Sequence, residues 1–186
     1  MPHILILAAS VRTGRKSIRV VTYFKNYIEK NKFATIAIAD LKELNFPIFN
    51  ERLRFLKDPA KEITDFSSAI KSADGVLIVT PEYNGGYPPA LKNAIDLLYE
   101  EWHRKPVAIA TVSDGSFGGT QVITSLQFTL WKMRAWTVPA MFPVPKVADS
   151  FSEEGVPTDI AATDKRANTF ISELLWCIDA KSKMNS

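Results

Sequence analysis

Two uninterrupted aliphatic runs, at residues 3–9 and 75–79, restrict the folds open to this chain of 186 residues. Strands without a polar residue at every second position are typical of sheets that helices cover on both faces. Further strands are expected at 33–39, where the two faces alternate, and at 106–112 and 136–142. The chain therefore favours a sheet buried between two layers of helices.

Segments with the helical spacing of apolar residues follow each expected strand. They lie at 18–30, 59–72, 90–100, 120–134 and 159–181. Ser17 is expected to cap the first helix, and Pro59 is expected in the first turn of the second. Because a parallel strand pair needs a crossover, this alternation predicts a three-layer α/β fold with five parallel strands in the order 2-1-3-4-5. No internal repeat divides the chain, so residues 1–186 are expected to form one domain.

Composition argues against several classes of function. Cys177 is the only cysteine, and His3 and His103 are the only histidines, so neither a disulfide framework nor a Cys/His zinc site is expected. The net charge of +3 is too small and too dispersed for a nucleic-acid-binding protein. No apolar run reaches the roughly 20 residues that cross a bilayer, and the N-terminus lacks the basic region of a signal peptide. We therefore expect a cytoplasmic protein with no membrane or nucleic-acid partner, and an inert, buried Cys177 thiol.

A polar, basic loop follows the first strand and leads into a helix. Its residues include Ser10, Arg12, Arg15, Lys16 and Ser17. Hydroxyls, an arginine and the free N–H groups of a helix N-terminus favour a bound phosphate. The loop has a single glycine and matches neither a Walker loop nor a G-x-G-x-x-G motif, so a phosphate monoester fits better than a triphosphate. The alternative is a solvated basic turn that only caps the helix.

Two more loops follow expected strands, at 80–89 and 113–119. The backbone N–H groups of Glu82, Tyr83 and Asn84 are expected to face a ligand, and the glycines of the second loop are expected to let the backbone approach a flat ring. Because loops at the carboxyl ends of parallel strands meet at one edge, the three loops favour one extended ligand. That ligand would have a phosphate at one end and an aromatic heterocycle at the other. For 80–89, a tight surface connection without a ligand is the alternative.

Three segments together resemble the NAD(P)H-dependent FMN reductase family, which has a flavodoxin-like fold and includes flavin, quinone, azo-dye and chromate reductases. These segments are Ser10-x-Arg12 followed by Ser17, then Pro81–Asn84, then Pro88–Asp96. The resemblance covers residues 3–142 and departs from the family at Ala9, where a glycine is usual. It implies an FMN site made by ten residues: Ser10, Arg12, Arg15, Ser17, Pro81, Glu82, Tyr83, Asn84, Ser113 and Gly115. The first four of them would hold the phosphate.

The resemblance also implies a reaction and an assembly. Hydride passes from NAD(P)H to FMN, and electrons then pass to a free flavin, a quinone, an azo compound or a metal oxyanion in a ping-pong scheme without a catalytic side chain. The assembly implied is a homodimer or homotetramer, and we expect Tyr99 and Trp102 on the subunit contact. Apolar residues of the long connection after the second strand are further candidates for that contact: Phe46, Phe49, Phe55 and Leu56.

Two alternatives stay open at this point. A flavodoxin-like electron carrier would bind FMN without enzymatic turnover, although such carriers are usually acidic and this chain is basic. A flavin-free hydrolase or transferase would need a nucleophile, but the chain has no G-x-S-x-G elbow and no Ser/His pair in the three loops.

Overall fold

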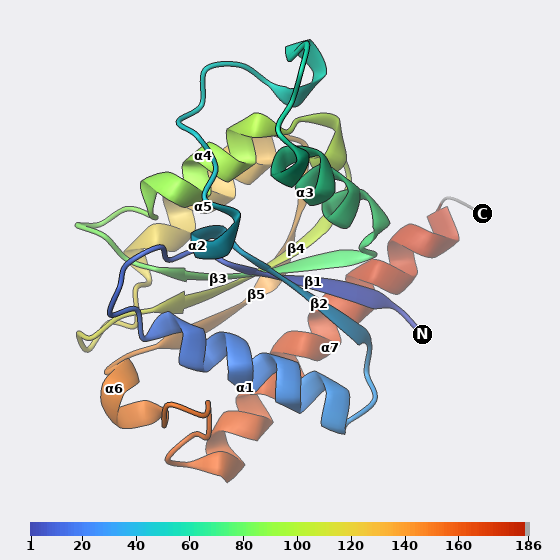
Figure 1. Ribbon diagram of the computed structural model, residues 1–186. Helices are drawn as coiled ribbons and strands as arrows, with labels where there is room; N and C mark the ends of the chain where they lie inside the picture. Colours follow the sequence, from blue (N-terminus) through green and yellow to red (C-terminus); the bar gives the residue numbers. More distant parts are fainter. Residues whose placement is uncertain (185–186) are drawn as a thin grey trace.

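The computed structural model describes residues 1–184 and is built around one parallel sheet (Figure 1). Its strands are β1 (His3–Ala8), β2 (Thr35–Asp40), β3 (Gly75–Pro81), β4 (Pro106–Val112) and β5 (Trp136–Val144). Every neighbouring pair is parallel, and the order is β2-β1-β3-β4-β5. The α/β fold and the strand order predicted from the alternation are confirmed.

Helices connect the strands and cover both faces of the sheet. They are α1 (Ser17–Lys30), α2 (Leu41–Leu44), α3 (Lys61–Ser72), α4 (Pro89–Leu97), α5 (Gln121–Lys132), α6 (Val147–Ser150) and α7 (Ile160–Met184), with short 3-10 turns η1 (Leu53–Phe55) and η2 (Glu100–Trp102). Helices α1 and α7 cover one face, and α3, α4 and α5 cover the other (Figure 1). On β1, Ile4 and Ile6 belong to the first core, whereas Leu5 and Leu7 belong to the second. Both faces of β1 are thus buried, which explains its uninterrupted aliphatic sequence.

Several local expectations differ from the structure. Ser17 is the first residue of α1 rather than its cap, because Lys16 before it already has helical backbone angles. Pro59 lies before α3, whose N-cap residue is Ala60. The residues between the expected strand at 136–142 and the expected helix at 159–181, for which no element was predicted, contain the short helix α6.

Trp102 is fully buried, which contradicts its expected place on a subunit contact. The chain folds back after α4 into η2, and the Trp102 indole Nε1–H donates a hydrogen bond to the Ile95 carbonyl at 3.2 Å. Tyr99 is only half-buried. Cys177 is fully buried as expected, and burial raises the pKa of its thiol.

The carboxyl ends of β1, β3 and β4 lie side by side at one edge of the sheet, so their loops meet there. Over residues 1–184, no helix is both long and apolar enough to cross a membrane. The same residues contain no group of three or more His, Cys, Asp or Glu side chains that could hold a metal ion. The single-domain expectation extends to residues 185 and 186, which lie outside the described residues.

Candidate functional site

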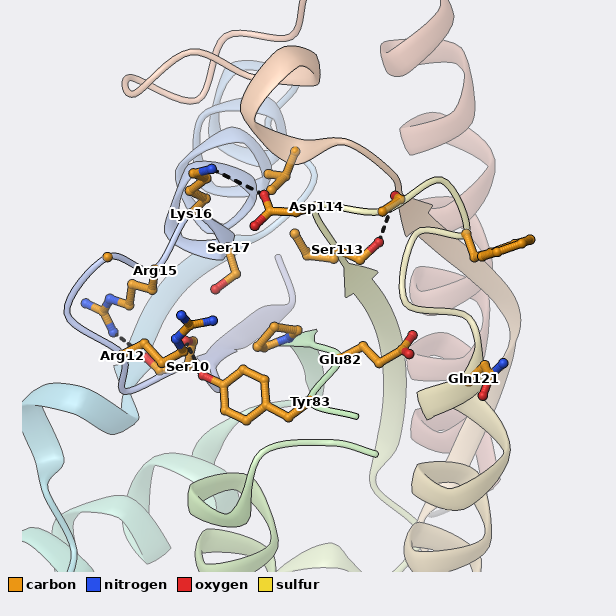
Figure 2. Close-up of a pocket in the computed structure, with 16 residues that line it drawn as sticks. Ser10, Arg12, Arg15, Lys16, Ser17, Glu82, Tyr83, Ser113, Asp114 and Gln121 are labelled. Carbon is orange, nitrogen blue, oxygen red and sulfur yellow. Dashed lines mark hydrogen bonds and ion pairs between the residues drawn. The ribbon is translucent and has the colours of Figure 1, made fainter. Parts of the chain in front are cut away.

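A cavity of about 340 Å³ opens where the loops after β1, β3 and β4 meet (Figure 2). Of the ten residues predicted for the site, nine line this cavity: Ser10, Arg12, Arg15, Ser17, Pro81, Glu82, Tyr83, Ser113 and Gly115. Asn84 is not among the lining residues. The convergence predicted for the three loops is therefore confirmed.

The end of the cavity beside α1 presents hydroxyls and a cation. Ser10 and Ser17 are both buried, and Ser17 begins a helix of 14 residues. Arg12 is exposed, and its guanidinium carbon lies 5.9 Å from the centre of the Tyr83 ring. No ion pair engages Arg12 within residues 1–184. An exposed cation, two hydroxyls and a helix N-terminus make this end suited to an anionic group.

Arg15 also lines the cavity, but its guanidinium is bonded to the protein itself. Its Nη2 donates to Asp40 Oδ2 at 2.5 Å, and its Nη1 donates both to Asp40 Oδ1 and to the Ser10 carbonyl, the latter at 2.8 Å. Sequence reasoning grouped Arg15 with the phosphate ligands and had no signal for this partner. Asp40 comes from the end of β2, the strand that pairs with β1.

The loop after β3 forms a two-residue turn. Tyr83 N–H donates to the Gly86 carbonyl at 2.8 Å, and Gly86 N–H donates back to the Tyr83 carbonyl at 3.1 Å. Asn84 and Gly85 both have positive φ, 52° and 82°, which is the type I′ geometry that Asn-Gly favours. The Tyr83 hydroxyl lies 2.9 Å from Ser10 Oγ, so this turn touches the loop after β1.

The turn corrects one expectation about backbone donors. Glu82 N–H donates to the Val112 carbonyl at 3.2 Å, and Tyr83 N–H is used within the turn. Neither group is available to a ligand. Among residues 1–184, the Asn84 N–H has no hydrogen-bond partner, so it is the donor that remains of the three expected.

The loop after β4 is supported by the segment after β5. Ser113 N–H donates to the Val144 carbonyl at 3.0 Å, and Val147 N–H donates to the Ser113 carbonyl at 3.1 Å. Lys146 N–H donates to the Gly115 carbonyl, also at 3.1 Å. These bonds explain why Val147, which belongs to no motif in the sequence, also lines the cavity.

Gly118 serves the packing of this loop rather than a close approach of ligand. It has a positive φ of 63°, and a Cβ there would lie 2.9 Å from Pro143 Cβ and 3.1 Å from two backbone nitrogens. Gly118 does not line the cavity. The expectation that the glycines of this loop face a flat ring is therefore wrong for Gly118.

Three further polar residues complete the site. Lys16 Nζ lies 3.3 Å from Asp114 Oδ1 and joins the loops after β1 and β4, and Gln121 lies at the start of α5 near Glu82 (Figure 2). Lys16 was recognised as part of the basic loop, whereas Asp114 and Gln121 had no motif. The cations of the lining all lie on the loop after β1, whereas the loops after β3 and β4 contribute the carboxylates of Glu82 and Asp114. The volume of the cavity lies within the roughly 300–1,000 Å³ of small-molecule sites.

Comparison with known proteins gives consistent matches. The model of the family described as NADPH-dependent FMN reductase matches residues 2–149. The chain is 33% identical over 138 residues to an NAD(P)H-dependent FMN reductase of Saccharomyces cerevisiae, covering 67% of this chain and 71% of that protein. It is 35% identical over 91 residues to a quinone reductase of Pseudomonas putida, covering 46% of this chain and 48% of that protein.

A solved structure shows the same fold over nearly the whole chain. The flavoenzyme NAD(P)H:(acceptor) oxidoreductase of Paracoccus denitrificans matches with a TM-score of 0.75, covering 95% of this chain and 97% of that chain. The sequence identity is 22%, so this match supports the arrangement of the elements.

Proposed function

Because the chain belongs to the NADPH-dependent FMN reductase family, we propose that its cavity binds FMN with the phosphate beside α1 and the ring between the loops after β3 and β4. The family is one of oxidoreductases that use FMN and NAD(P)H. The proposal assigns ten residues to the FMN site: Ser10, Arg12, Arg15, Ser17, Pro81, Glu82, Tyr83, Asn84, Ser113 and Gly115.

The observation that carries this proposal is the polarity of the cavity along its length. The hydroxyls of Ser10 and Ser17 and the guanidinium of Arg12 lie at the N-terminus of α1, where they can donate hydrogen bonds to phosphate oxygens. The loops after β3 and β4 contribute no cation to the lining, and their charged lining residues, Glu82 and Asp114, are acidic. All the cations of the lining thus come from the loop after β1, which suits a ligand that carries its negative charge at one end.

FMN, when bound, would supply the redox chemistry, accepting hydride from NAD(P)H and passing electrons to a free flavin, quinone, azo compound or metal oxyanion in a ping-pong scheme. The chain's part is to hold the phosphate, fix the orientation of the ring and leave one face open to the second substrate. The Asn84 N–H, next to the lining residue Tyr83, is a backbone donor without a partner among residues 1–184, and it can stabilise negative charge on the ring.

An apolar groove of about 540 Å³ next to the site supports the assembly that we propose, a homodimer or homotetramer. Val11 at its edge directly precedes Arg12, and Ile48 in the long connection after β2 is 91% exposed. The side-chain amide of Asn93 on α4 holds this connection, bonding the Pro47 carbonyl at 2.8 Å and the Phe49 N–H. Light scattering on the purified protein measures the oligomeric state. A cytoplasmic location remains part of the proposal.

Titration of the ligand-free protein with FMN, followed by NAD(P)H oxidation, tests the function. We expect quenching of FMN fluorescence on binding, and oxidation of NAD(P)H by a soluble quinone at FMN concentrations far below that of the quinone. Binding without turnover would instead indicate an electron carrier. Absence of FMN binding would overturn the proposal.

A further inference from the structure

Arg15 and Asp40 form the most fully enclosed ion pair of the described residues. Their side chains are 12% and 16% exposed, and the two groups meet through both guanidinium nitrogens and both carboxylate oxygens. A planar guanidinium facing a carboxylate in this way gains geometric specificity as well as energy. The pair lies at the wall of the cavity, where Arg15 is a lining residue.

Asp40 is a rigid partner because two elements hold it. It is the last residue of β2, opposite Ala8 at the end of β1, and it is also the N-cap residue of α2. Its Oδ1 accepts a hydrogen bond from Lys42 N–H at 3.0 Å. The carboxylate is therefore fixed to the edge of the sheet rather than to a flexible loop.

Arg15 transmits this fixed position to the loop after β1. Its Nη1 bonds the Ser10 carbonyl at 2.8 Å, and its own N–H bonds the Arg12 carbonyl at 3.4 Å. The side chain of Arg15 thus closes a ring over residues 10–15, and Arg12 lies inside that ring. Ser17 follows two residues later at the start of α1.

We propose that Arg15 and Asp40 are a positioning pair that orders residues 10–17 for phosphate, and that Arg15 itself does not contact the phosphate. This inference rests on the proposed FMN site. Turning the guanidinium towards the cavity would leave a largely buried Asp40 carboxylate without its counter-charge, which is strongly unfavourable. The cations left for direct contact are Arg12 and Lys16, both of which are more exposed than Arg15.

A double-mutant cycle on FMN affinity separates positioning from contact. We expect Arg15→Ala and Asp40→Ala each to weaken FMN binding about tenfold, and the double variant to bind no more weakly than either, because both changes remove one shared interaction. If Arg15 instead contacted phosphate, Asp40→Ala would leave FMN affinity unchanged or raise it. That result would overturn the proposal.

Riboflavin and hydrogen exchange provide two controls. Riboflavin has no phosphate, so its affinity should change less than about twofold in both variants, whereas general damage to the fold would weaken both ligands. Amide exchange of residues 10–17 in the ligand-free protein should become faster in both variants. Equal losses of riboflavin and FMN affinity, or unchanged exchange, would contradict a positioning role.

The outcomes also separate this inference from the proposed function. If the unmodified protein failed to bind FMN, the proposed function would fail, while the exchange of residues 10–17 would still test whether the pair orders the loop. If the unmodified protein bound FMN and the Asp40→Ala variant bound it with the same affinity, only the positioning role would fail. Arg15→Lys and Asp40→Asn serve as conservative variants should an alanine variant not fold, and the same cycle applies to them.

Discussion

The loop after β1 is fixed by charged side chains, whereas the loops after β3 and β4 are fixed by backbone hydrogen bonds. Arg15 and Lys16 pair with Asp40 and Asp114 on the first side. On the other side, Tyr83 pairs with Gly86, and the loop after β4 bonds the segment after β5 through main-chain groups. Side-chain changes should therefore act on the phosphate end, and changes that disturb the backbone should act on the ring end.

The largest effect is expected from Gly118→Ala, which disturbs the backbone of the ring end. An alanine at a φ of 63° with its Cβ 2.9 Å from Pro143 should lower the free energy of unfolding by about 2–4 kcal/mol. The matched control is Gly115→Ala, whose Cβ would meet only Ser113 Oγ at 4.0 Å. Denaturant unfolding of the ligand-free variants measures both. Similar losses in the two would contradict the packing role of Gly118.

Lys105 lies at the opposite edge of the sheet, and it tests whether a charged side chain far from the site affects the stability of the fold. Its side chain is buried, with Nζ bonded to the Lys71 and Ala73 carbonyls, and burial lowers its pKa to about 8. Between pH 8 and about 10.4, the Lys105 side chain is mostly deprotonated in the folded protein but still protonated in the unfolded chain. The free energy of unfolding should therefore rise over this range, by up to about 3 kcal/mol relative to Lys105→Met.

The Lys105 effect is measured as the difference between the two pH profiles of unfolding. A difference that stays constant from pH 7 to pH 10 would show that the pKa of Lys105 is not lowered in the folded protein. Lys105→Met should bind FMN with unchanged affinity, since Lys105 lies outside the cavity lining.

Arg12→Ala should weaken FMN binding by roughly 1.5–3 kcal/mol, the usual size of a hydrogen bond to a charged group. Riboflavin affinity should stay nearly constant, because the lost contact is to phosphate. Arg54→Ala is a matched control that removes an exposed arginine paired with Glu100, outside the cavity lining. An Arg12 variant that binds FMN like the unmodified protein would count against the phosphate end.

The smallest effect is expected from Lys16→Ala. Its partner Asp114 is 72% exposed, so the pair should contribute less than about 1 kcal/mol to FMN binding. The difference should disappear in about 1 M salt, which screens exposed charges. A large, salt-independent loss would mean that Lys16 has a more direct role than the comparison assigns.

The strand order and the meeting of the three loops followed from the sequence because parallel strands direct their carboxyl ends to one edge. The same reasoning placed Ser10, Arg12 and Ser17 on the cavity that these loops form. It did not identify Asp40 as the partner of Arg15, because that pairing depends on the register that places Asp40 opposite Ala8. No local pattern in either strand encodes that pairing.

Two other misses have different causes. The Asn84-Gly85 dipeptide already favours a tight turn that uses the Tyr83 N–H, and weighing it would have removed one expected donor. Trp102 was misplaced because its burial depends on how the chain folds back after α4, and an isolated tryptophan carries no signal of that. The turn could therefore be predicted from the sequence, whereas the tertiary packing of Trp102 could not.

A crystal structure of the protein with FMN tests the central claim most directly. We predict the phosphate within hydrogen-bond distance of the Ser10, Arg12 and Ser17 side chains, with Arg15 still on Asp40 and the ring between the loops after β3 and β4. A phosphate bound at the ring end, or an FMN molecule outside this cavity, would contradict the account.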